Sequence, residues 1–118
     1  MPVLLRRVYD DPAAEEGKRV LVDRLWPRGL TEEAAHVDEW LKDVAPSNEL
    51  RTWYGHDPER WEEFGRRYLA ELGDATHRSA LDGLREMLRT GPVTLLTATK
   101  VIEHSHAAIL ADLLGEQS

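Results

Sequence analysis

VLVDRLWPRG, residues 20–29, joins a short apolar run to a cluster of charged, aromatic and turn-forming residues. An apolar run that is bounded by turn residues is typical of a buried strand. Charged side chains and a tryptophan at the end of such a strand cost free energy unless they are paired or used. The stretch therefore predicts a strand that leads into a functional site.

Apolar runs elsewhere in the chain extend this pattern to three strands, over Leu4–Tyr9, Arg19–Leu25 and Val93–Thr99. Capping residues and apolar residues at helical spacing predict helices between and after the strands. These cover about Glu32–Asp43, a short segment capped by Ser47, Asp57 to near Gly73, about His77–Arg89 and about Glu103–Leu114. Three tryptophans at helical spacings are expected in the core, namely Trp40, Trp53 and Trp61.

Strands that are apolar on both faces and separated by helices indicate a small, largely parallel sheet with helices packed on it. We therefore expect an α/β fold with a three-layer, Rossmann-like or flavodoxin-like topology. The connection between the first two strands is short for a parallel crossover, so an α+β fold with a hairpin there is the alternative. The length of 118 residues fits one domain over residues 1–118.

Composition restricts the class of protein further. Hydrophobic residues make up 42% of the chain and charged residues 31%, and no apolar run approaches the roughly 20 residues that span a bilayer. The first residues, MPVLLRRVYDD, lack the long apolar segment of a signal peptide. Cysteine is absent, which excludes disulfides, thiolate ligands and cysteine nucleophiles and suits a reducing cytoplasm. A soluble protein with no membrane partner is expected.

The charge is distributed unevenly along the chain. The formal net charge is −7, yet residues 1–31 hold six Lys and Arg against five Asp and Glu, while residues 32–118 hold nine against seventeen. Overall acidity argues against binding along a nucleic-acid backbone. It leaves room for one local anion pocket in the N-terminal part.

Ligands of open parallel sheets usually bind beyond the carboxyl ends of the strands. Polar and aromatic residues follow each predicted strand there. They are Tyr9 and Asp10, then Asp23, Arg24, Trp26 and Arg28, then Lys100, Glu103, His104 and His106. If the strands are parallel, these residues converge on one rim.

The arginines and the lysine of this rim suit an anionic ligand. Guanidinium groups bind carboxylate or phosphate with two hydrogen bonds, and Arg28 lies in a Pro-Arg-Gly turn that a ligand can approach closely. The functional interpretation is anion binding by Arg24, Arg28 and Lys100. The alternative is an internal salt bridge in which Asp23 pairs with Arg24 or Arg28, and both can hold.

Two histidines follow the third strand as His104-Ser105-His106. Without cysteine or an obvious third ligand, no metal site is predicted. A hydrogen bond or a proton transfer suits His106 better, and simple exposure is the alternative for either histidine. Both glycine-rich phosphate motifs, GxGxxG and GxxxxGK[ST], are missing, and no cofactor is expected.

Three segments together carry a family resemblance. RVLVDRLWPRGL, DEWLKDVAPSNELRTWYGHDPERWEEF and VTLLTATK with a following histidine resemble the DUF488 family, and within it the short YeaO-like branch. The resemblance covers about Leu5 to Leu114. It implies an α/β fold and a cytoplasmic bacterial or archaeal protein, and it implies no activity, since the function of this family is uncharacterised.

The family pattern also marks positions of this chain. These are Asp23, Arg24, Trp26, Pro27, Arg28, Gly29, Trp40, Lys42, Ala45, Pro46, Ser47, Leu50, Arg51, Trp53, His56, Lys100 and His106. It thereby adds Lys42, Arg51 and His56 to the candidates, and of these Arg51 and His56 are taken as ligand-binding residues. Three departures from the pattern are Glu32, Thr97 and Ser105, where the family usually has Lys, Tyr and Asn. This chain therefore lacks the phenol and the amide that the family usually carries at two of these positions.

Two classes of function follow from these observations. The first is a small-molecule enzyme or ligand-binding domain for an anionic metabolite, such as a phosphorylated one. Asp23 and His106 would be its catalytic residues, and Arg24, Trp26, Arg28, Lys100, Arg51 and His56 would bind the ligand. The second is a nucleic-acid or protein-interaction module in which the Asp/Arg motif is structural. Homo-oligomerisation is left open.

Overall fold

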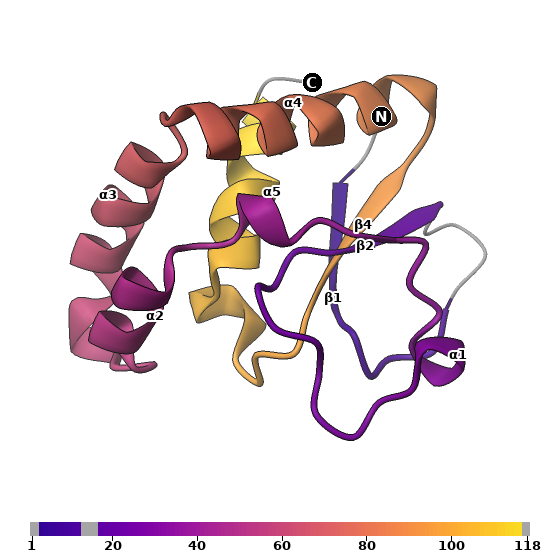
Figure 1. The fold of residues 1–118 in the computed structure, drawn as a ribbon, viewed down its shortest axis with the longest axis horizontal. Helices are drawn as coiled ribbons and strands as arrows, with labels where there is room; N and C mark the ends of the chain where they lie inside the picture. The colour runs from indigo at the N-terminus through magenta and orange to yellow at the C-terminus, as the bar shows by residue number, and fades with distance from the viewer. Residues whose placement is uncertain (1–2, 13–16, 117–118) are drawn as a thin grey trace.

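A four-stranded parallel sheet organises the molecule (Figure 1). The structure is a computed structural model that describes residues 3–12 and 17–116. The strands are β1 (Val3–Arg7), β2 (Lys18–Leu21), β3 (Glu39–Trp40) and β4 (Val93–Thr97), in the order β1-β4-β2-β3. Every neighbouring pair is parallel, so the predicted parallel α/β class is confirmed.

The hairpin alternative is wrong because β4 lies between the first two strands. Leu95 of β4 is opposite Leu5 of β1 on one side and Val20 of β2 on the other. All five residues of β4 are buried, as expected for the centre of a parallel sheet. Residues 8–17 therefore connect two strands that are not neighbours.

Within residues 3–12 and 17–116, five α-helices and three short 3₁₀ helices accompany the sheet. The α-helices are α1 (Glu32–Ala35), α2 (Asn48–Tyr54), α3 (Trp61–Glu71), α4 (Ala75–Thr90) and α5 (His106–Glu116), and the 3₁₀ helices are η2 (Lys42–Val44), η3 (Pro58–Arg60) and η4 (Ile102–His104). In Figure 1 α3 lies at the left, α4 at the top and α5 between α3 and the sheet, and the loops after the strands lie at the lower edge. The predicted helices after Ser47, Asp57 and His77 are confirmed, with α4 starting two residues early.

The sheet divides the core into two unequal parts. Val20 belongs to the larger cluster, which α2 to α5 complete, whereas its neighbour Leu21 belongs to a smaller cluster with Val8 and Leu96. Successive residues of a strand point to opposite faces, which explains this division. The smaller cluster is covered by α1 and by loop residues such as Trp26. This helical layer is shorter than predicted, because α1 is much shorter than the expected helix over Glu32–Asp43.

The predicted helix over Glu32–Asp43 is wrong beyond its first turn. The guanidinium of Arg19, which is only 4% exposed, donates hydrogen bonds to the carbonyls of Ala35 and His36 and so satisfies the end of α1. His36 then takes a left-handed conformation with φ 51°. The following residues pair with β2, where the Leu41 amide donates to the Leu21 carbonyl over 2.8 Å.

This pairing also corrects the placement of Trp40, which is 38% exposed on the edge strand β3 and lies outside the core. Trp53 and Trp61 do pack against the larger cluster. The last helix begins three residues later than predicted, because Ser105 caps α5 with its hydroxyl, which accepts a hydrogen bond from the Ala108 amide. Within the described residues, no helix is long and apolar enough to cross a membrane.

Gly17 and Gly83 provide a matched pair of substitutions that tests how closely the backbone at Gly17 approaches Pro92. A Cβ at Gly17, where φ is +67°, would lie 2.2 Å from the Pro92 carbonyl oxygen. We expect Gly17→Ala to lower the free energy of unfolding by about 2 kcal/mol or more. Gly83→Ala, in open space within α4, should raise it by about 0.5–1 kcal/mol. Urea unfolding measures both, and equal effects of the two substitutions would contradict this account.

Candidate functional site

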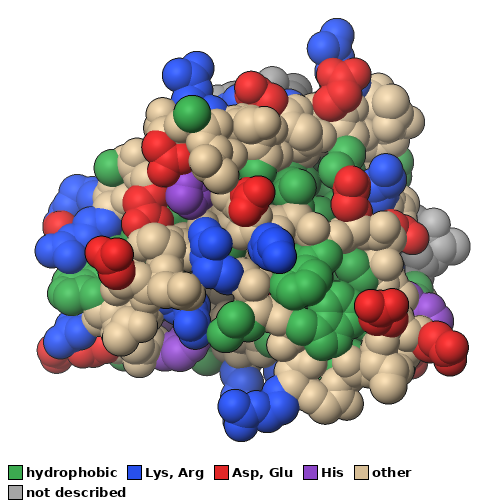
Figure 2. Space-filling view, in the orientation of Figure 1, with side chains coloured by type: hydrophobic (Ala, Val, Ile, Leu, Met, Phe, Trp, Pro, Cys, Tyr) green, Lys and Arg blue, Asp and Glu red, His purple; other side chains and the backbone are tan. Residues whose placement is uncertain are grey.

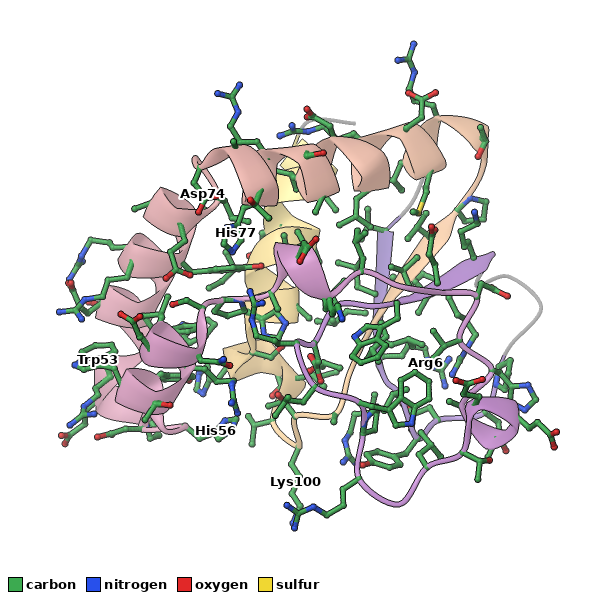
Figure 3. All side chains as sticks on the ribbon, in the orientation of Figure 1. Arg6, Trp53, His56, Asp74, His77 and Lys100 are labelled. Carbon is green, nitrogen blue, oxygen red and sulfur yellow. The ribbon has the colours of Figure 1, made fainter. Side chains whose placement is uncertain are left out.

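Two adjoining cavities lie at the carboxyl ends of the strands, with volumes of about 380 and 400 Å³. The first is lined by Asp23, Arg24, Trp26, Arg28, Arg51, His56 and His106, which are all but one of the predicted site residues. The remaining one, Lys100, lines the second cavity. Figure 3 shows Lys100 and His56 at the lower edge of the molecule, on the side of the strand ends.

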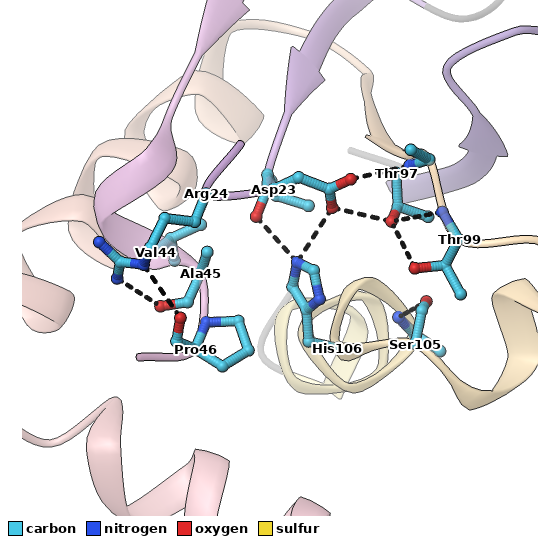
Figure 4. A network of polar contacts seen from close by, with 12 residues as sticks. Asp23, Arg24, Val44, Ala45, Pro46, Thr97, Thr99, Ser105 and His106 are labelled. Carbon is cyan, nitrogen blue, oxygen red and sulfur yellow. Dashed lines mark hydrogen bonds and ion pairs between the residues drawn. The ribbon is translucent and has the colours of Figure 1, made fainter. Parts of the chain in front are cut away.

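Asp23 sits where β2 ends and binds two other elements (Figure 4). Its Oδ1 accepts a hydrogen bond from the Thr97 hydroxyl and its Oδ2 accepts one from the Ala98 amide, each over 2.8 Å. Its Oδ1 also lies 3.3 Å from Nε2 of His106. The carboxylate thus connects the ends of β2 and β4 with the start of α5.

His106 is held in one tautomer by its surroundings. Nε2 lies 2.8 Å from the Val22 carbonyl oxygen, which can only accept, so this nitrogen carries the proton. Burial lowers the pKa of His106 below its ordinary value of 6.5; Asp23 and the Val22 hydrogen bond oppose that shift, and His56 adds to it. The neutral ring leaves the Nδ1 lone pair without a partner among the described residues.

Arg24 does not pair with Asp23, and neither does Arg28. Within residues 3–12 and 17–116 no ion pair joins these arginines to that carboxylate, so the predicted internal salt bridge is not formed. The Arg24 guanidinium donates to the backbone carbonyls of Pro46 and Ala45, each over 3.1 Å. Carbonyl oxygens carry only partial charge, so the positive charge of Arg24 is oriented without being neutralised.

The segment that receives Arg24 is fixed from behind by α4. Nε2 of His77 lies 2.9 Å from the same Ala45 carbonyl, and Nδ1 contacts both oxygens of Asp74 at 2.8 and 2.9 Å. The backbone N–H and then the ring of His77 bind that carboxylate and lower the pKa of Asp74. Tyr68 adds a hydrogen bond from its hydroxyl to the Val44 carbonyl. The wall beside Arg24 is therefore rigidly positioned.

The remaining cations of the site are exposed and nearly free of partners. In the described part of the chain, the side chains of Arg28 and Lys100 form no hydrogen bond or ion pair. Arg51 makes one weak contact, 3.5 Å from the Asn48 amide oxygen. His56 follows Gly55 in a second left-handed conformation, with φ 57°, which is uncommon for a residue with a side chain.

The first cavity is therefore positive within an acidic chain. Its lining contains three arginines and a single carboxylate, Asp23, whereas the whole chain carries −7. The second cavity adds Lys100 and no carboxylate. Figure 2 shows Lys and Arg side chains gathered around a hollow in this face, next to a hydrophobic patch.

The tryptophans near the site are engaged in packing. Trp26 donates its indole N–H to the Leu30 carbonyl, and its ring meets the Trp40 ring edge-on at 5.4 Å. The guanidinium groups of Arg60 and Arg67 lie over the ring of Trp53 at 5.2 and 4.2 Å. Trp26 therefore forms a wall of the first cavity, and Trp53 is engaged by two guanidinium groups.

Other residues of the predicted rim separate into two groups. Tyr9 and His104 line the first cavity, whereas Asp10 and Glu103 line neither of the two; Asp10 contacts Arg6 instead. His104 packs against the Trp61 ring at 5.1 Å while His106 points to Val22, so the two do not converge on one ion. No cluster of three metal-ligating side chains occurs among residues 3–12 and 17–116.

Sequence reasoning missed several lining residues, among them Tyr54, Phe64 and Thr99. The two aromatics lie in helices, α2 and α3, and both are buried. Tyr54 and Phe64 belong to the larger core cluster and also line the first cavity, which lies where the core ends between α2 and α3. Thr99 stands two residues after Thr97 at the end of a strand. Residues two positions apart in an extended segment point to the same side, and this spacing could have indicated Thr99 as a lining residue.

Fold and cavity together define a class: a small parallel α/β domain with a cation-lined pocket at the carboxyl edge of its sheet. The chain belongs to the DUF488 family, since the family model described as "Inactive DUF488-N3 subclade" matches residues 2–118. The predicted family is confirmed.

Curated relatives support the same branch. "Uncharacterized protein Rv3073c" of Mycobacterium tuberculosis (strain ATCC 25618 / H37Rv) is 50% identical over 113 residues, which cover 96% of this chain and 93% of the relative. "Uncharacterized protein YeaO" of Escherichia coli (strain K12) is 40% identical over 114 residues and 97% of each chain. No solved structure matches the chain at a significant level.

Replacing Asp23 tests its structural bonds. Asn presents one acceptor oxygen and one donor group, so either the Thr97 hydroxyl or the Ala98 amide loses its acceptor. We expect Asp23→Asn to lower the free energy of unfolding by about 1–3 kcal/mol in urea titrations. Asp112→Asn, on the exposed side of α5, serves as the control and should change it little. A variant at position 23 as stable as the wild type would show that these contacts contribute nothing.

The lowered pKa of His106 predicts a pH dependence of stability. Below the ordinary pKa of 6.5 the unfolded chain takes up a proton that the buried ring resists, so stability falls as pH decreases toward the folded-state pKa. The fall in Tm between about pH 7.5 and about pH 5.5 should therefore be smaller in His106→Gln than in the wild type. His36→Asn, at an exposed histidine, should keep the wild-type slope. Identical slopes for all three proteins would contradict the assignment.

Proposed function

We propose that this protein binds a small anionic ligand, such as a phosphorylated metabolite, in the cavity at the carboxyl ends of its strands. One observation carries the proposal: three arginines line the cavity, and no carboxylate among the described residues neutralises them there. A cavity of about 380 Å³ falls within the range of small-molecule sites. Fixed guanidinium groups favour carboxylate and phosphate over neutral ligands.

Each proposed contact follows from the geometry of the residue. Arg24 is oriented by two carbonyls and would supply a fixed charge, while Arg28 and Arg51 are exposed and would close on the anion from the rim. Trp26 would form an apolar wall. The Nδ1 lone pair of His106 would accept a hydrogen bond from a hydroxyl or a protonated oxygen of the ligand.

Binding is supported better than turnover. The Ser105 hydroxyl is occupied, since it donates to the Ile102 carbonyl and caps α5, and the chain has no cysteine nucleophile. The matching family model is described as inactive, which points the same way. Proton transfer by His106, aided by Asp23, is the second candidate because the ring is neutral and adjoins a carboxylate. Ligand turnover, followed by NMR and lost in His106→Gln, would favour it.

The alternative of a nucleic-acid module has less support. The net charge is −7, and the Trp53 ring is already covered by two guanidinium groups. The bacterial relatives and the family resemblance fit a cytoplasmic protein, which forms part of the proposal.

Thermal stability measured with increasing phosphate, sulfate and a panel of phosphorylated metabolites tests the proposal. A ligand that binds the folded state raises Tm with its concentration. Arg28→Ala should weaken the best ligand about tenfold or more, the loss expected for a charge-assisted hydrogen bond. Arg78→Ala removes an exposed arginine that lines neither cavity and controls for general salt effects. Equal shifts for wild type, Arg28→Ala and Arg78→Ala would overturn anion recognition at this site.

A further inference from the structure

The two cavities adjoin each other at the carboxyl ends of the strands. Five residues line both of them, namely Tyr54, His56, Ala98, Thr99 and His104. The similar volumes, about 380 and 400 Å³, exceed by far what one phosphate ion fills. A ligand that reaches from one cavity into the other would occupy both volumes.

Each of the two cavities has cationic side chains in its lining. The first cavity holds Arg24, Arg28 and Arg51. The second holds Lys100, with no Asp or Glu among the residues that line it. His56, on the shared wall, lies close enough to His106 to help lower its pKa. Both cavities therefore favour a negative group, and the five residues that they share include no Lys, Arg, Asp or Glu.

The shared wall is mainly aromatic and apolar. The Tyr54 ring stacks on Phe64 with centroids 4.2 Å apart, and the ring of His104 packs on Trp61. Two apolar side chains are unusually exposed around the same space, Leu25 at the first cavity and Val101 at the second. Such surfaces suit an apolar or planar part of a ligand.

We infer that the ligand is an elongated molecule with an anionic group at each end and an apolar or planar part between them. One end lies among Arg24, Arg28 and Arg51 and the other at Lys100. The inference rests on the proposed function and adds the class of ligand to it: a metabolite with two separated phosphate or carboxylate groups. Lys100 selects for the second group, because a ligand with one anionic end leaves it unpaired.

Alkane bisphosphonates of increasing chain length, each compared with the alkylphosphonate of the same length, test the inference by calorimetry. In the wild-type protein a bisphosphonate long enough to span both cavities should bind about tenfold tighter than its alkylphosphonate. Lys100→Ala should abolish this advantage, so that the bisphosphonate and the alkylphosphonate of each length bind equally. Lys42→Ala, at a lysine that lies over the Trp40 ring, is the matched control and should keep the advantage.

The outcomes distinguish the two proposals. Equal binding of the two phosphonates at every length, or an unchanged advantage in Lys100→Ala, overturns the two-ended ligand while the anion site stands. The two-ended ligand is also overturned if the advantage of the bisphosphonate grows with chain length in Lys100→Ala as it does in the wild type. If no phosphonate binds and phosphate does not bind either, the proposed function fails together with this inference.

Discussion

The Asp23 carboxylate is the contact on which the candidate site depends. It ends β2, accepts hydrogen bonds from Thr97 and Ala98 at the end of β4, and adjoins His106 at the start of α5. Three elements from distant parts of the sequence are therefore aligned at one point, and the cavity opens beside it. Because these bonds satisfy Asp23 without an arginine, the arginines that follow in the chain stay available. A salt bridge between Asp23 and Arg24 or Arg28 would instead have neutralised part of the positive charge of the cavity.

The cavity also stays positive because neutral backbone groups, and no carboxylate, hold Arg24 in place. Arg24 is oriented by two carbonyls of the segment after η2, and that segment is held by His77 from α4 and Tyr68 from α3. Neutral acceptors fix a guanidinium group in space but leave most of its charge uncompensated. The long helices thus contribute to the site indirectly, through the backbone that they hold in place. This explains why a domain with so many carboxylates can contain a cation-lined pocket.

The parallel sheet and its functional edge could be predicted because they follow from local signals. Apolar runs define the strands, and the polar residues that begin at Asp23 and Thr99 lie at one edge once the strands are parallel. The helix expected through Asp43 failed because Arg19, far away in sequence, caps its first turn and draws Glu39–Trp40 into the sheet. The use of Tyr54 and Phe64 as cavity walls could not be predicted either. Helical spacing shows that a residue is buried, but it does not show where the core ends and a pocket begins.

The position of β4 in the sheet has a consequence for how the chain reaches its folded state. β4 is central and pairs with both β1 and β2, yet residues 22–92 separate it from β2 in the sequence. During synthesis the first two strands therefore emerge from the ribosome long before their common partner. Until then their unpaired edges are exposed, and contacts between residues so distant in sequence form slowly. The order in which the strands pair thus makes the completion of the sheet a late event in folding.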